Sequence, residues 1–114
     1  MNAGNQNRAC SKTIVKPRNP SLILMNIINA SDILKRYAEQ KRNFQNLNFS
    51  RVDLKGADLQ GIDFSYANLN SADLSSTNLI DTNLIWTDLN RANLRQANLT
   101  QACLLHSSLF WADL

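Results

Sequence analysis

A leucine or phenylalanine stands at every fifth position from Phe44 to Leu114, without interruption. The series is Phe44, Phe49, Leu54, Leu59, Phe64, Leu69, Leu74, Leu79, Leu84, Leu89, Leu94, Leu99, Leu104, Leu109 and Leu114. On an α-helix a step of five residues turns by roughly 140°, so these side chains would scatter around the axis. In a flat strand an odd step places neighbouring members on opposite faces. The chain must therefore turn a corner about every five residues, which predicts an all-β solenoid with these side chains lining its core.

The other positions of the five-residue unit fit a narrow coil. Two residues before each core residue stands a mostly small residue, such as Ala57 or Thr77, which shares the inward face. The residue just before the core position is usually Asp or Asn, and both tolerate turns and hydrogen-bond nearby backbone groups. The last two positions are variable and mainly polar, as expected for outward-facing corners.

With this pattern, seen in Ala57-Asp58-Leu59 and Ala92-Asn93-Leu94, residues 44–114 resemble the pentapeptide-repeat family. The resemblance implies a right-handed quadrilateral β-helix with four repeats in each coil, and therefore about three and a half coils here. The departures from the pattern are Arg42, Leu47, Val52 and Ile62 at the small-residue position and Cys103 and Ser108 in place of Asp or Asn. They concern local packing and leave the predicted fold unchanged.

The first part of the chain differs from the repeats in charge and composition. Residues 1–43 hold eight basic and two acidic residues, whereas residues 44–114 hold four basic and seven acidic ones. Residues 1–29 are predicted to form a disordered leader, because residues 1–20 are rich in Asn, Lys, Arg and Pro, and Met25 is an alternative natural start. The apolar run of residues 22–28 is too short to span a bilayer and lacks a small-x-small cleavage site. We therefore expect a cytoplasmic location, with export as the less favoured alternative.

Residues 30–43 are predicted to form one helix that leads into the first coil. Asn29 or Ser31 can cap its N-terminus, and Asp32 lies favourably in the first turn. Its expected apolar face is Ile33, Leu34, Tyr37 and Ala38. Because the first coil of a solenoid exposes unpaired backbone groups, we expect this helix to cap that end as a lid. A membrane-surface or RNA-binding role for its basic residues is the alternative.

Sorting the outward residues onto four sides separates one apolar side from polar ones. The side built on Leu54, Leu74 and Leu94 is wholly polar, whereas the side built on Phe64, Leu84 and Leu104 presents aromatic and aliphatic residues. The candidate partner-binding face consists of Tyr66, Ile85, Trp86, Leu105, His106, Phe110 and Trp111, with the first, third and fifth of these expected to stack in one column. Contiguous exposed apolar surface marks contact sites, although such aromatics can also simply pack along the rod.

Catalytic, cofactor and metal sites are not expected from this sequence. His106 has only Cys103 nearby as a potential nucleophile, and the aspartates are explained by turn chemistry. A single histidine offers no zinc-binding spacing, and three glycines form no phosphate-binding loop. The two cysteines, Cys10 and Cys103, lie far apart in the sequence, so a disulfide framework is not expected either.

These observations predict a non-catalytic protein-interaction scaffold or adaptor, similar to the short helix-capped repeat proteins that are abundant in cyanobacteria. The alternative comes from the quinolone-resistance members of the family, which imitate DNA and occupy DNA gyrase. Such imitation needs a long and densely negative rod, whereas residues 44–114 are short and only mildly acidic. The partner is an unknown protein, nucleic acid is not expected, and no transmembrane segment is expected. Because Leu114 is itself a core leucine, a homodimer through the C-terminal coil is a further prediction, with a truncated longer repeat protein as its alternative.

Overall fold

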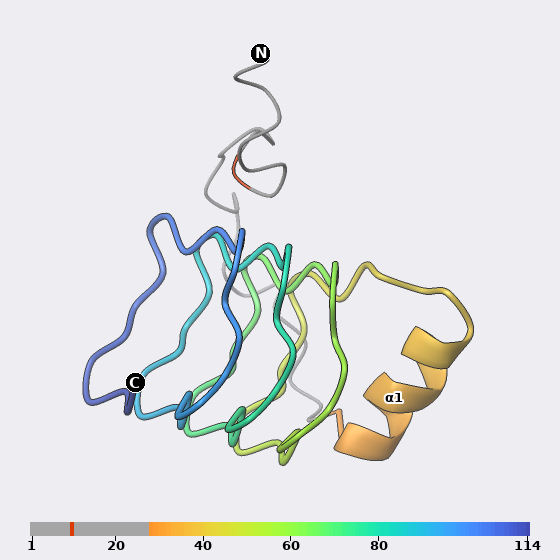
Figure 1. Ribbon diagram of the computed structural model, residues 1–114, viewed down its shortest axis with the longest axis horizontal. Helices are drawn as coiled ribbons and strands as arrows, with labels where there is room; N and C mark the ends of the chain where they lie inside the picture. The colour runs from red at the N-terminus through yellow and green to blue at the C-terminus, as the bar shows by residue number, and fades with distance from the viewer. Residues whose placement is uncertain (1–9, 11–27) are drawn as a thin grey trace.

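The computed structural model describes residue 10 and residues 28–114. In the described part, one helix, α1 (Ala30–Ala38), is followed by a coil of repeats that winds away from it toward the C-terminus (Figure 1). The disorder predicted for the leader and the alternative start at Met25 concern residues that lie almost wholly outside this part. Within it, no helix is long and apolar enough to cross a bilayer.

Successive coils are joined by a parallel backbone ladder. Eleven bridges link the residue before each core position to its equivalent one coil later, from Asn43 with Asp63 to Asn93 with Asp113. Each bridge is made by backbone hydrogen bonds that run in opposite directions between the two coils. At the first bridge the Phe44 N–H donates to the Asp63 carbonyl and the Asp63 N–H donates to the Arg42 carbonyl, both at 2.8 Å. The bridges stay isolated rather than merging into long strands across the described repeats, because a corner follows each of them. Equivalent residues therefore stack in columns along the rod.

Each corner is a turn whose third residue has a positive φ. The N–H of Ala57, for example, donates to the carbonyl of Leu54 across the turn at 3.0 Å. A positive φ at this position distinguishes type II from type I turns and favours glycine. Glycine stands there only at Gly56 and Gly61, and the other twelve corners carry side chains in the left-handed conformation. Since that conformation costs roughly 1–2 kcal/mol for an L-residue, the ladder and the core must hold these corners in place.

The Asp or Asn before each core residue braces the corner that follows. In twelve repeats its side-chain oxygen accepts the backbone N–H two residues further on, as in Asp53 to Lys55 at 3.1 Å and Asn83 to Ile85 at 3.0 Å. This is the Asx-turn chemistry expected of these residue types. The acidic residues of the repeats are therefore mainly structural.

Ser108 lacks the side-chain carbonyl that this brace requires, and a residue of the preceding coil supplies it. The Asn90 Oδ1 accepts both the backbone N–H of Phe110 and the hydroxyl of Ser108, each at 2.7 Å. The departure at position 108 thus changes the origin of the acceptor without opening the corner.

The leucine and phenylalanine series fills the interior of the coil. Every member from Phe44 to Leu94 is at most 3% exposed, and the rings of Phe44, Phe49 and Phe64 lie in contact, with centroids 5.3–6.1 Å apart. Val52 and Ile62, which stand where a small residue is usual, also point inward and are buried. Toward the other end the burial declines: Leu99, Leu104 and Leu109 are half-buried and Leu114 is 74% exposed. The core is therefore closed at the helix end and open at the last described repeat.

Helix α1 ends at Ala38, five residues before the predicted boundary at residue 43. Gln40 takes the left-handed conformation with φ 71°, and the N–H of Lys41 closes the end by donating to the carbonyl of Arg36 at 3.0 Å. This arrangement of bonds is the usual helix stop, in which Gly or Asn is preferred at the position of Gln40. The Arg42 guanidinium, 3.6 Å from the centre of the Tyr37 ring, donates to the Tyr37 carbonyl at 2.8 Å.

The face that α1 buries differs in part from the predicted one. Ile33 is fully buried and Tyr37 is half-buried, but Leu34 is 42% exposed and Ala38 is exposed. Ala30 contacts the core in their place. Because residues three and four apart share a helix face, a nine-residue helix buries the narrow stripe of residues 30, 33 and 37 rather than the wider predicted face.

The residues around α1 also supply hydrogen bonds to the outer edge of the first coil. The Tyr37 hydroxyl donates to the Gln60 carbonyl at 2.6 Å, and the Ile28 N–H donates to the Asn48 carbonyl at 2.9 Å. One coil later, the equivalent carbonyls accept N–H groups of the first coil. The first coil itself has no preceding coil to supply such donors. The helix and its flanks thus take the place of a preceding coil, both in the core and at the backbone.

Candidate partner-binding face

Tyr66, Trp86 and His106 occupy the same corner in three successive coils. The ladder sets this register, since the Tyr66 N–H donates to the Ile85 carbonyl at 2.9 Å and the Trp86 N–H donates to the Leu105 carbonyl at 3.0 Å. The rings of Trp86 and His106 stack, with centroids 4.3 Å apart and planes 13° from parallel. The rings therefore contact each other along the rod, which lowers the ring area available to a partner.

Exposure of the predicted face is uneven. Ile85 is only 1% exposed and Trp86 is half-buried, whereas Leu105, one coil beyond Ile85, is 44% exposed. Phe110 and Trp111, at 72% and 81%, are more exposed still. The apolar surface that is open to solvent thus comes mainly from the last described coil.

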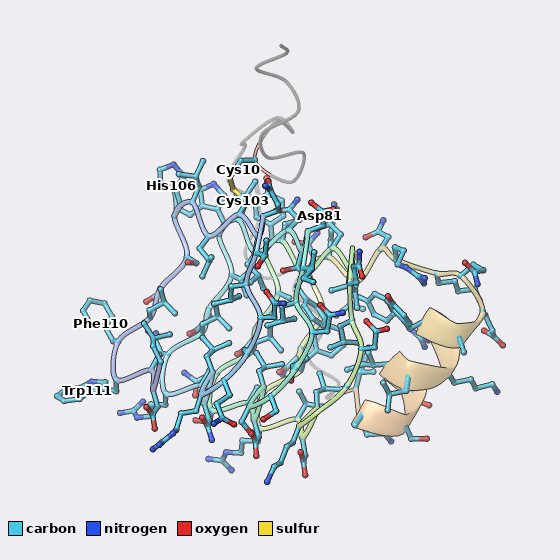
Figure 2. All side chains as sticks on the ribbon, viewed as in Figure 1. Cys10, Asp81, Cys103, His106, Phe110 and Trp111 are labelled. Atoms are coloured by element: carbon cyan, nitrogen blue, oxygen red, sulfur yellow. A yellow bond between two sulfur atoms is a disulfide. The ribbon has the colours of Figure 1, made fainter. Side chains whose placement is uncertain are left out.

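The residues of the candidate face that Figure 2 labels lie at two corners of the rod. His106 lies at the corner beside Cys103, whereas Phe110 and Trp111 project from the neighbouring corner at the open end of the rod. His106 thus lies on one corner of the rod, and Phe110 and Trp111 lie on the adjacent one.

The two cysteines form a disulfide, so the expectation that they would not is wrong. Cys10 and Cys103 are bonded, with their Cα atoms 5.1 Å apart although 93 residues separate them in the sequence (Figure 2). Separation along the chain sets no lower limit on distance in space, which is why the sequence argument fails. Cys103 and Ile85 are both 1% exposed and form a small apolar cluster with Cys10 and Trp86. The one sequence signal for this bond is the replacement of Asp or Asn by Cys103.

The side of the rod built on Leu54, Leu74 and Leu94 is polar, and its side chains make hydrogen bonds and an ion pair within this side. Asp73 accepts the Ser75 hydroxyl at 2.6 Å and the Ser75 N–H at 3.0 Å, and these bonds, helped by the charge of Lys55, hold the pKa of the Asp73 carboxyl below its usual value. Arg95 and Asp113 form an exposed ion pair at 3.8 Å. No three His, Cys, Asp or Glu side chains of the described residues gather as they would around a metal ion. The polar side thus offers hydrogen bonds and charge to solvent.

The comparisons with known proteins agree with this geometry. The family pattern described as pentapeptide repeats (8 copies) matches residues 43–79 and 77–114, which together are more than half of the chain. The chain belongs to the pentapeptide-repeat family. That membership implies the right-handed quadrilateral β-helix, whose repeat interval is the interval of the bridges described above.

Two solved pentapeptide-repeat proteins are similar to this chain over most of its length. HetL of the cyanobacterium Nostoc sp. strain PCC 7120, a protein involved in the regulation of heterocyst differentiation, is 40% identical with a TM-score of 0.75, over 76% of this chain and 37% of HetL. A thylakoid-lumen protein of Arabidopsis thaliana is 29% identical with a TM-score of 0.53, over 61% of this chain and 49% of its own. The chain thus spans less than half of either protein. A comparison with curated proteins finds no match.

Proposed function

We propose that this pentapeptide-repeat protein is a non-catalytic scaffold or adaptor that binds a protein partner through Leu105, His106, Phe110 and Trp111. The rod that carries this surface has about three and a half coils if the interval of the bridges holds over residues 44–114. The observation that carries the proposal is the exposure of two large aromatic side chains, Phe110 and Trp111, whereas the other Phe, Tyr and Trp side chains of the described part are at least half-buried. Exposed aromatic anchors of this kind dominate binding energy at protein interfaces.

The chemistry of the remaining residues supports a binding role over a catalytic one. The sulfur of Cys103 is bonded to Cys10, so it does not act as a thiolate beside His106 in this state. The aspartates of the repeats accept backbone N–H groups in their own corners. HetL, which is similar over three quarters of this chain, is described by a regulatory role. The gyrase-mimic alternative draws no support from a face that is partly apolar and a repeat region that is only mildly acidic.

The cytoplasmic location and the homodimer stay predictions. In reducing compartments such as the cytoplasm, disulfides are rare, and those that occur are usually transient or regulatory. A permanent Cys10–Cys103 bond therefore weighs against a cytoplasmic location, whereas a transient one is compatible with it. The exposed Leu114 and Phe110 at the open end support pairing with a second copy, and the same surface would suit further coils of a longer chain. Sedimentation at several protein concentrations distinguishes dimer from monomer.

Affinity capture from cell extract, followed by binding of the purified partner, tests the scaffold proposal. We expect the wild type to retain a partner that Trp111→Asp and Phe110→Asp lose, because each variant places a charge in the exposed apolar surface. Ser76→Asp is the matched control, since Ser76 occupies the same corner position on the polar side and is exposed. A partner bound equally by all four proteins would place the binding site elsewhere. Unchanged far-UV circular dichroism is required of each variant.

A further inference from the structure

We propose that the partner anchored by Phe110 and Trp111 is an acidic protein segment, whose carboxylates pair with Arg51 and Arg91 on the same corner of the rod. The inference rests on the proposed function, because it names the chemistry of the partner for that surface. It extends the surface from the last described coil back along the corner to the first coil, over a distance of about 14 Å at the usual spacing of paired strands.

The backbone ladder places Arg51, Arg91 and Trp111 at equivalent positions of one corner, in the first, third and fourth coils. The Arg51 N–H donates to the Asn70 carbonyl and the Arg91 N–H donates to the Phe110 carbonyl, both at 2.8 Å. Since paired strands lie about 4.8 Å apart, the backbones of the two arginines lie about 10 Å apart along the rod, and that of Trp111 lies about 5 Å beyond Arg91. The corner therefore presents two cations and an aromatic anchor in one line.

The basic residues of the repeats gather at two adjacent corners. Residues 44–114 hold four of them, namely Arg51, Lys55, Arg91 and Arg95. The corner with Arg51 and Arg91 contains no Asp or Glu, since its other outward residues are serine, asparagine, phenylalanine and tryptophan. The two remaining corners of the described repeats carry no Lys or Arg, and one of them carries Asp81. A partner that contacts the exposed aromatic side chains therefore meets positive charge along the same corner.

The two arginine side chains of this corner are free to contact a partner. Both are exposed, and within the described residues neither side chain makes a hydrogen bond or an ion pair. Arg95, on the adjacent corner, is instead paired with Asp113 at 3.8 Å. Because exposed ion pairs add little binding free energy, the aromatic side chains supply most of the affinity and the arginines select partners by charge.

The charges beside this corner favour the carboxylates of a protein over the phosphates of a nucleic acid. Asp53 and Asp88 flank the corner, and Asp88 accepts the Asn90 N–H at 2.9 Å. Residues 44–114 hold seven acidic and four basic residues, a net charge of −3. A nucleic acid carries a phosphate at every nucleotide and would lie against these aspartates, whereas a protein segment can place single carboxylates at the two arginines. An acidic segment is therefore the partner that this charge pattern fits.

Synthetic peptides test the selection by charge before the natural partner is known. The probe is a fluorescein-labelled peptide with two glutamates three residues apart, which span about 10 Å in an extended chain, followed by two leucines. We expect the full-length wild type to bind it at least about threefold more tightly than the same peptide with glutamine in place of glutamate. The preference should shrink as NaCl is raised, because salt screens exposed charges. Fluorescence anisotropy measures each dissociation constant.

Charge reversal locates the contact on the rod. Arg51→Glu and Arg91→Glu should each weaken binding of the glutamate peptide about threefold or more, and Arg91→Glu should bind the matched lysine peptide more tightly than the glutamate one. Arg95→Glu is the matched control, since it makes the same change of charge in the same coil as Arg91→Glu but on the adjacent corner, and it should keep the preference for glutamate. Equal effects of Arg91→Glu and Arg95→Glu would show that net charge alone acts and would overturn the assignment to this corner.

Three further outcomes would overturn the inference. These are equal binding of the glutamate and glutamine peptides, no binding of the glutamate peptide at roughly millimolar concentration, or tighter binding of a labelled thymidine oligonucleotide. Trp111→Ala separates the inference from the scaffold proposal. If it abolishes binding of both peptides and the wild type shows no preference by charge, the acidic partner is excluded and the scaffold proposal stands. If it leaves the affinity and the preference unchanged, the pairing with the arginines stands and the aromatic anchor of the scaffold proposal fails.

Discussion

At the scale of the residue, the Asp or Asn before each core position fixes a corner, and Asn90 shows how a missing brace is replaced. We expect Asn90→Ala to lower the free energy of unfolding by about 1–2 kcal/mol, because the Phe110 N–H and the Ser108 hydroxyl both lose their acceptor. Asn70→Ala is the matched control one coil earlier, where the amide oxygen accepts only the Ser71 hydroxyl. Urea unfolding measures both, and equal losses would contradict the special role of Asn90.

Asp73 gives a residue-scale prediction for pH. Its pKa is lowered in the folded state, mainly by the hydroxyl and N–H of Ser75, so its carboxylate stabilises the fold above the unfolded pKa, near 3.8. That contribution is lost as the pH falls through the lower folded value. Asp73→Asn keeps an oxygen acceptor but cannot ionise. The difference in urea midpoint between wild type and variant should therefore be largest at neutral pH and shrink below about pH 4, and a difference independent of pH would refute this origin.

At the scale of the element, α1 acts as the first coil's cover, and Ile33 carries its apolar contact. Ile33→Ala should cost about 2–4 kcal/mol of unfolding free energy, since it empties a fully buried position against the core. Leu34→Ala, on the neighbouring and exposed part of the same helix, should change stability by no more than about 0.5 kcal/mol. Thermal or urea unfolding compares the two. Similar losses in both variants would mean that the lid buries the wider face predicted from the sequence.

The elements also show what the sequence can and cannot predict. The five-residue series predicts the coil because no straight element can hold it, and Asn29 predicts the start of α1 because its side chain caps the Asp32 N–H. The end of α1 is missed because Gln40, rather than Gly or Asn, takes the left-handed position. The Cys10–Cys103 bond is missed because no local pattern encodes the place of Cys10 beside Cys103.

At the scale of the whole molecule, the burial of the core declines along the described rod, from Leu54 at 2% exposed to Leu114 at 74%. In a solenoid each coil contacts only its neighbours, so local opening should begin where the core is least buried. Leu54, Leu74 and Leu94 hold equivalent places in successive coils, and their N–H groups donate to Asp73, Asn93 and Asp113 at 2.8, 2.8 and 2.7 Å. The three bonds have nearly the same length, so differences in their exchange rates report on position along the rod.

Amide hydrogen exchange should therefore be slowest at Leu74, nearly as slow at Leu54 under the lid, and at least about tenfold faster at Leu94, which corresponds to roughly 1.4 kcal/mol. Ile33→Ala should accelerate exchange at Leu54 and leave Leu94 unchanged, because the substitution opens the covered end alone. Acceleration at both sites would mean that the rod opens as one cooperative unit. Fast exchange at Leu54 in the wild type would mean that α1 and its bonds to the first coil's edge do not replace a preceding coil.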